Sequence, residues 1–177
     1  MSLTISLTPA EVEQRLGALG IVCRFTPEER TAFDTKPVVD GSGRLFGFPT
    51  PADNALLTLQ FIKRCVGVDP RRQPAFFEHP WYKDESFMSS RCAPGWHFLM
   101  MDVLPESIQQ PVNYLHSSRG ATLELPSAVE VILMLFLHYI ASGEQLLLKK
   151  HTWCSDTSSL HQHVTVGAFG RNGVFLS

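Results

Sequence analysis

The longest apolar stretch of the chain runs from Pro126 to Gly143, with the sequence PSAVEVILMLFLHYIASG. Its start has the pattern of a capping box, in which the Ser127 hydroxyl and the Glu130 carboxylate each accept a hydrogen bond from the other residue's amide. Gly143 suits the left-handed conformation that ends many helices. We therefore predict one long helix here, buried in the core on most of its sides.

A mixed stripe is expected along this helix. When residues are placed at about 100° intervals, one sector collects most of the polar side chains and shares them with a few small or apolar ones. The sector contains Ser127, Glu130, His138, Ser142 and Gln145, together with Val131, Met134 and Ala141. We expect function wherever this stripe faces, whether a polar pocket or a second subunit; if it faces only water, the helix is scaffold.

Three threonine-proline pairs in the first third of the chain each have a carboxylate three residues after the threonine. Threonine at the N-cap, proline at the first helical position and an acid at the third all favour the start of a helix. The pairs predict helices from Pro9 to about Leu19, from Pro27 for a short distance, and from Pro51 to about Val66.

Strands are predicted mainly in the second half of the chain. The Asn172-Gly173 pair is the strongest hairpin signal, and strand alternation places Phe175 on the same face as Val164, Val166 and Ala168, the expected core face. The predicted strands are Ile21–Phe25, Leu45–Phe48, Trp96–Val103, Leu146–Cys154, His163–Phe169 and Val174–Leu176.

The order of these elements predicts the fold class. Helices that precede most strands indicate an α+β fold, as a single compact domain over residues 1–177. We expect N-terminal helices and a long buried central helix packed on a small, mostly antiparallel sheet that ends in a C-terminal hairpin. The segment 68–95 is irregular and rich in proline, and its aromatic residues favour a loop anchored to the core.

Composition and charge narrow the class of protein. The chain has 177 residues, of which 44% are hydrophobic and 18% charged, and this is typical of a globular protein. A net charge of −2 gives no reason to expect nucleic acid or a membrane as partner. The apolar run is shorter than the roughly 20 residues that cross a bilayer. Four cysteines without a CxxC pair, and no signal segment, favour a reduced protein in the cytoplasm.

One group of side chains has the chemistry of a metal site. Imidazole and thiolate bind zinc or iron, and two histidines two residues apart on a strand place both rings on one face. The candidates are His151, Cys154, His161 and His163. The spacing matches no zinc finger, so ordinary surface histidines explain the same residues. The sequence requires no cofactor.

Two further patterns offer candidate chemistry. Cys92 follows Arg91 and precedes His97 by five residues, so it is a candidate nucleophile whose thiol pKa an adjacent arginine would lower. The basic and aromatic residues between Lys63 and Lys83 resemble the composition of a single-stranded nucleic-acid site, but nearby acidic residues nearly cancel the positive charge. We therefore expect Cys92 to be an ordinary small apolar residue or a loop thiol, and the basic and aromatic stretch to be an anchored loop.

Two functions of different class remain open. The first is a non-enzymatic binding protein that holds a partner chain, its own copy or a small molecule, with self-association suggested by the apolar faces of the last hairpin. Its candidate contact residues are Trp81, Tyr82, Trp96, His97, Glu130, His138 and Trp153. The second is a metal-dependent or Cys/His hydrolase that uses the cluster from His151 to His163, with Trp96 and Trp153 as pocket walls.

Overall fold

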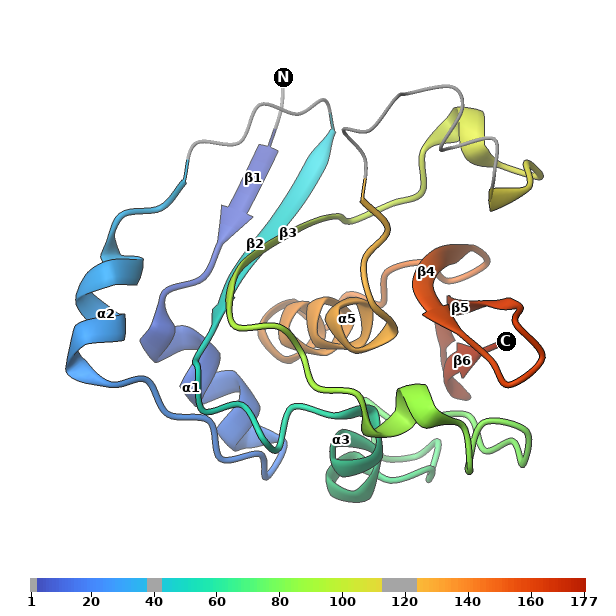
Figure 1. Ribbon diagram of the computed structural model, residues 1–177, viewed down its shortest axis with the longest axis horizontal. Helices are drawn as coiled ribbons and strands as arrows, with labels where there is room; N and C mark the ends of the chain where they lie inside the picture. The colour runs from blue at the N-terminus through green and yellow to red at the C-terminus, as the bar shows by residue number, and fades with distance from the viewer. Residues whose placement is uncertain (1–2, 38–42, 113–123) are drawn as a thin grey trace.

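The computed structural model describes residues 3–37, 43–112 and 124–177, and its fold is α+β as predicted (Figure 1). The helices are α1 (Pro9–Ala18), α2 (Pro27–Asp34), α3 (Leu59–Val66) and α5 (Ala128–Ser142). The strands are β1 (Leu3–Ser6), β2 (Arg44–Thr50), β3 (Gly95–Met100), β4 (His151–Thr157), β5 (His163–Gly170) and β6 (Gly173–Leu176), and there are 3-10 turns at Ser86–Ser89 and Pro105–Ser107.

The strands form two small sheets rather than one. The first has the order β1-β2-β3, with β1 parallel and β3 antiparallel to β2, and the second is the antiparallel sheet β4-β5-β6. Figure 1 shows α5 between the two sheets and α2 on the outer side of the first, while α1 packs against both α5 and β2. The parallel pairing of β1 with β2 joins distant parts of the chain, so local patterns gave no signal for it.

Helix α5 confirms the predicted central helix and both of its ends. Ser127 is the N-cap of a complete capping box with Glu130, and Gly143 ends the helix in the left-handed conformation at φ 70°. Two distant side chains also bond to the backbone of α5, one at its first residue and one in its second half. Asp156 Oδ2 accepts a hydrogen bond from the Ala128 amide at 2.6 Å, and Arg15 donates to the Leu137 carbonyl at 3.0 Å.

The first two predicted helix starts are confirmed, and the third is wrong. Helix α3 begins at Leu59, after the N-cap Thr58, whose hydroxyl accepts from the Phe61 amide. Thr50 instead closes β2, and its hydroxyl donates to the Ala93 carbonyl at 2.6 Å. Thr50 is the last residue of an extended strand and is followed by non-helical residues, so no helix amides lie where its hydroxyl could accept from them. Residues 21–25, predicted as a strand, form none.

The C-terminal hairpin is confirmed, but the predicted face of Phe175 is wrong. The register shifts within the hairpin, so that Phe175 lies opposite Gly167 while Leu176 lies opposite Val166. The shift moves Leu176 rather than Phe175 to the buried face, as a β-bulge does. Apolar residues from which self-association was predicted, Phe169, Val174 and Leu176, are buried within this chain.

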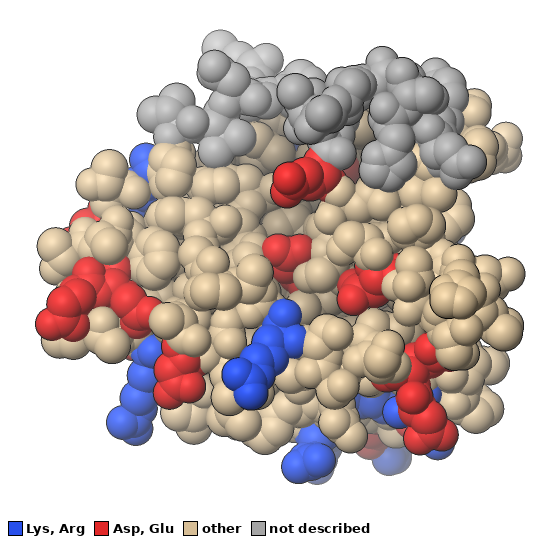
Figure 2. Space-filling view, viewed as in Figure 1, with Lys and Arg blue, Asp and Glu red and all other residues tan. Residues whose placement is uncertain are grey.

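The irregular segment 68–95 is anchored by its aromatic side chains. Phe76, Tyr82 and Phe87 are buried, and the Lys63 ammonium lies 4.7 Å from the centre of the Tyr82 ring. Figure 2 shows acidic and basic side chains interspersed among uncharged ones on this face of the molecule. In the described ranges, no helix has both the length and the apolar character needed to cross a membrane.

Candidate binding cavity

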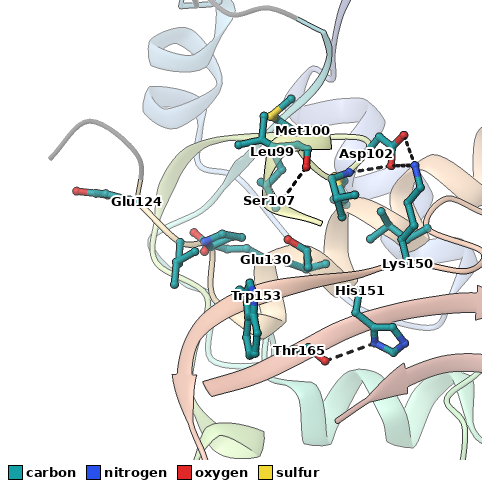
Figure 3. A pocket seen from close by; sticks show the side chains of 18 of the residues that line it. Leu99, Met100, Asp102, Ser107, Glu124, Glu130, Lys150, His151, Trp153 and Thr165 are labelled. Atoms are coloured by element: carbon teal, nitrogen blue, oxygen red, sulfur yellow. Dashed lines mark hydrogen bonds and ion pairs between the residues drawn. The ribbon is translucent and has the colours of Figure 1, made fainter. Parts of the chain in front are cut away.

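A cavity of about 630 Å³ opens between the edges of β3 and β4, above the N-terminal half of α5 (Figure 3). Its walls include Trp96 and Phe98 on one side and Trp153 on the other, and its floor includes Val131 and Met134. Sites for small molecules typically enclose roughly 300–1,000 Å³ and are mainly apolar, with a few polar groups. The cavity has the size and composition of such a site.

The mixed stripe predicted on the central helix faces two different places. Its N-terminal part, with Glu130, Val131 and Met134, lines the cavity. His138, further along, is buried and contacts Glu144 Oε2 at 2.8 Å, while its ring packs edge-on against Phe46. The stripe therefore contributes one polar residue to the cavity floor, Glu130.

Glu130 is held by hydrogen bonds on both carboxylate oxygens. His97 Nδ1 lies 2.6 Å from Oε1, and Oε2 accepts from the amide and hydroxyl of Ser127. Burial raises the pKa of Glu130, but the hydrogen bonds from His97 and Ser127 outweigh it and hold the pKa below its usual range. The carboxylate is therefore ionised, and His97 Nδ1 donates to it.

The second nitrogen of His97 faces the loop before β3. Nε2 lies 2.9 Å from the Ala93 carbonyl and 2.9 Å from the Thr50 hydroxyl. Through its two nitrogens the ring of His97 joins β3 and its preceding loop to α5, with Glu130 on one side and Ala93 and Thr50 on the other.

Cys92 lies beside this ring but has no access to the cavity. Its Sγ is 3.7 Å from His97 Nε2, and the residue is 1% exposed and absent from the cavity wall. Burial, and then the charge of Glu130, raise the pKa of the Cys92 thiol to about 12. The thiol is therefore protonated at neutral pH, and Cys92 packs as a small apolar residue.

Cys92, His97 and Glu130 form the one group of three metal-ligand side chains that converges in the described part of the chain, with ligand atoms within 4.8 Å of one another. Both nitrogens of His97 and both oxygens of Glu130 already have protein partners. A cation would have to displace these hydrogen bonds and deprotonate a buried thiol. The chemistry of the group fits a hydrogen-bonded network better than a metal site.

The predicted metal residues face different surroundings. Cys154 is fully buried, which raises the pKa of its thiol well above the ordinary value, and its carbonyl contacts His163 Nδ1 at 2.9 Å. His161 is exposed in the turn between β4 and β5, and His151 lines the cavity. Strand alternation and a register shift between Trp153 and Thr157 separate these side chains.

The predicted contact residues divide between cavity and core. Trp96, His97, Glu130 and Trp153 line the cavity. Outside it, Trp81 donates to the Leu176 carbonyl, and Tyr82 donates to the Phe77 carbonyl. Sequence reasoning missed Thr50, because its cap-like context hid its role, and it missed the ion pair of Lys150 with Asp102 at the rim.

This site is built from segments distant in the sequence. The pair of His97 with Glu130 joins β3 to α5, and Thr50 comes from β2. The spacing of these residues along the chain does not predict that they meet in the fold. Comparisons with protein-family models, with curated proteins and with solved structures found no match, so the function has to be argued from the cavity itself.

Proposed function

We propose that the protein is a non-enzymatic binding protein whose ligand occupies the cavity between β3 and β4. The observation that carries this proposal is the floor of the cavity: the N-terminal part of the polar stripe on a mostly apolar helix faces it through Glu130. Ligand sites combine an apolar lining with a few fixed polar groups. Val131, Met134 and the two tryptophans supply the lining here.

The same polar groups favour binding over catalysis. A general acid or base must exchange a proton with its substrate, and a nucleophile must reach it. Both oxygens of Glu130 accept hydrogen bonds from protein groups, and both nitrogens of His97 contact protein acceptors. These side chains thus fix the shape and charge of the site without offering a reactive atom.

The experiment is a fragment screen by two-dimensional NMR on the full chain, with hits titrated by tryptophan fluorescence. We expect the hits to shift the amides of β3, β4 and the start of α5, and Trp153→Ala to weaken their binding about tenfold, because an aromatic wall is lost. The matched variant Trp153→Phe should retain most of the affinity. Hits that map to another surface, or an unaffected Trp153→Ala, would contradict the proposal.

A second candidate function is thiol-based acyl transfer by Cys92, favoured by one observation. The imidazole of His97 lies between a thiol and a carboxylate: Nε2 is 3.7 Å from Cys92 Sγ, and Nδ1 is 2.6 Å from Glu130 Oε1. This is the order of nucleophile, base and orienting acid in a catalytic triad. The thiol would have to pass its proton to Nε2, and this requires that nitrogen to be free of a proton.

Iodoacetamide labelling at neutral pH separates the two candidates. Cys65 is half-buried and serves as the internal reference, whereas the other three cysteines are buried. If the protein is a binding protein, Cys65 reacts first and Cys92 stays unlabelled until the chain unfolds. Selective fast labelling of Cys92, lost in Cys92→Ser, would favour the enzyme.

A further inference from the structure

We infer that the cavity receives an extended peptide that pairs with the edge of β3 that faces away from β2. This inference rests on the proposed function and names the class of ligand. The free edge of a strand offers a row of main-chain donors and acceptors at the spacing of another strand, and strand addition to such an edge is a common mode of peptide recognition.

The register of the first sheet shows which groups of β3 are free. The Met101 amide donates to the Arg44 carbonyl at 2.9 Å, and Trp96 lies opposite Pro49, which has no N–H. Antiparallel pairing alternates, so the residues bonded to β2 are every second one from Met101. The N–H and C=O groups of Trp96, Phe98 and Met100 therefore point away from β2, and these three residues line the cavity.

The other outer edges carry some cover within the described residues. In β6, the Val174 carbonyl accepts from the Phe77 amide, and the Val174 amide donates to the Ala75 carbonyl. The Lys36 ammonium donates to the Ser6 carbonyl at the edge of β1, and the Ser155 amide of β4 donates to Pro126.

The edge of β3 differs from these. In the same part of the chain, no hydrogen bond is recorded for the outward groups of Trp96, Phe98 and Met100. The strand Gly95–Met100, GWHFLM, also lacks the lysine, proline or carboxylate that usually protects an edge.

The opposite wall offers main-chain groups as well. The Ala168 amide donates to the Lys150 carbonyl at 2.8 Å, so by the same alternation the peptide groups of His151 and Trp153 point away from β5. Both residues line the cavity. A peptide along β3 at about 3.3 Å per residue would direct every second side chain to the apolar floor of Val131 and Met134.

Charges at the two ends of the cavity select the ends of the peptide. Glu124 and Lys149 both line the cavity, are exposed, and have no ion pair with any other described residue. Figure 3 shows Glu124 at one end and Lys150, the neighbour of Lys149, at the other. The complementary peptide is a short β-forming segment with a basic residue at one end and an acidic residue at the other.

The probes are blocked heptapeptides in which valine and threonine alternate between a terminal lysine and a terminal aspartate, made in both orders and as a library varied at the valines. We expect a member to bind the full chain and to slow hydrogen exchange of the Phe98 and Met100 amides about tenfold. The matched control is the same peptide N-methylated at alternate residues, which keeps its side chains but loses its donors. It should bind at least about tenfold more weakly.

The matched protein variants are Phe98→Pro and Phe98→Ala. Both remove the ring, but only proline removes the outward N–H, and it leaves the hydrogen bonds to β2 in place. We expect Phe98→Pro to bind about tenfold more weakly than Phe98→Ala. If Phe98→Pro does not fold, the N-methylated peptide decides the same question.

Each outcome has one meaning. Equal binding of the N-methylated peptide, or unchanged exchange at Phe98 and Met100, overturns strand pairing. If fragments occupy the cavity with the expected response to Trp153→Ala and no peptide binds, the inference fails while the proposed function stands. If neither fragments nor peptides bind there, both fail.

Discussion

The carboxylate of Glu130 on α5 and the imidazole of His97 on β3 meet at 2.6 Å, and this contact ties the floor of the cavity to its wall. The two side chains are 18% and 6% exposed, so water screens the pair only weakly. Removing the Glu130 carboxylate leaves the His97 Nδ1 and Ser127 groups without their charged partner in a poorly hydrated place. The pair is therefore the point at which binding and stability are most closely linked.

Glu130→Gln should lower the free energy of unfolding by about 2–4 kcal/mol, because it removes a charge-assisted acceptor and places an amide group against donors from Ser127 or His97. Urea denaturation at neutral pH measures the loss. Asp84→Asn, at an exposed carboxylate, is the control and should change stability by less than about 0.5 kcal/mol. A neutral effect of Glu130→Gln would show that the pair contributes little.

The pH dependence of stability follows from the direction of the Glu130 pKa. Because the folded protein holds this pKa below its usual range, the ionised carboxylate favours the folded state. That stability is fully present above the unfolded carboxyl value of about 4.3 and is lost as the pH falls through the folded value. We expect the wild type to lose stability below about pH 4.3 and the Glu130→Gln variant to show a smaller loss.

Thr50→Val should cost about 1–2 kcal/mol of stability, because the hydroxyl that bridges Ala93 and His97 is buried and has no replacement. Thr50→Ser keeps the hydroxyl and should retain most of the stability. Thermal unfolding of the two variants side by side measures the difference. Equal destabilisation by serine and valine would mean that the methyl group, not the hydroxyl, matters at this position.

Thr50 also shows where prediction from sequence ends. The elements that were predicted correctly are fixed by neighbours in the chain: Ser127 with Glu130, Thr8 with Glu11, and Gly143 at a helix end. Thr50 has the same local pattern as Thr8, but its partners Ala93 and His97 come from β3 and the loop before it. The local pattern allows a cap at Thr50, but the pairing of β2 with β3, which places Thr50 opposite Gly95, keeps the chain extended there.

Sequence reasoning reached part of the site: the candidate contact residues Trp96, His97, Glu130 and Trp153 all line the cavity. The angular distribution of residues on the central helix singled out the stripe that contains Glu130, and that part of the helix does line the cavity. The partner of Glu130 was not predictable, because His97 is 33 residues away and reaches it only through the packing of β3 against α5. The parallel pairing of β1 with β2 was missed for the same reason.

Asp156→Asn should leave stability at pH 7 unchanged or raise it by up to about 1 kcal/mol. Burial raises the pKa of Asp156, the Ala128 amide partly opposes this, and Glu130 adds to it. A raised carboxyl pKa means that ionisation disfavours the folded state, so stability is lost as the pH rises through that range. Asparagine keeps an acceptor for the Ala128 amide and removes the charge.

The control for this variant is Asp156→Ala, which also removes the acceptor and should cost about 1 kcal/mol relative to asparagine. Guanidinium denaturation at several pH values separates the two effects. The gap between wild type and Asp156→Asn should narrow below about pH 3.9, where the carboxyl is neutral in both states. A gap that widens on acidification would show that the ionised carboxylate stabilises the helix start.

Gly167→Ala should be among the most damaging small substitutions in the chain, because β4 and β5 approach too closely there for a side chain. A Cβ at Gly167 would overlap the Lys150 carbonyl oxygen and lie 2.6 Å from the His151 Cα, and neither backbone atom can move without opening the cavity wall. We expect the free energy of unfolding to fall by about 3 kcal/mol or more, or the chain to fail to fold.

Gly170→Ala, on the same strand, is the matched control, since the nearest atom lies 3.7 Å away, and it should cost less than about 1 kcal/mol. Circular dichroism and urea titration of both variants measure the contrast. Similar stabilities of the two variants would contradict this, because they would mean that β4 can move away from β5 at Gly167 at little cost. The wall of the cavity formed by β4 would then be flexible at this point.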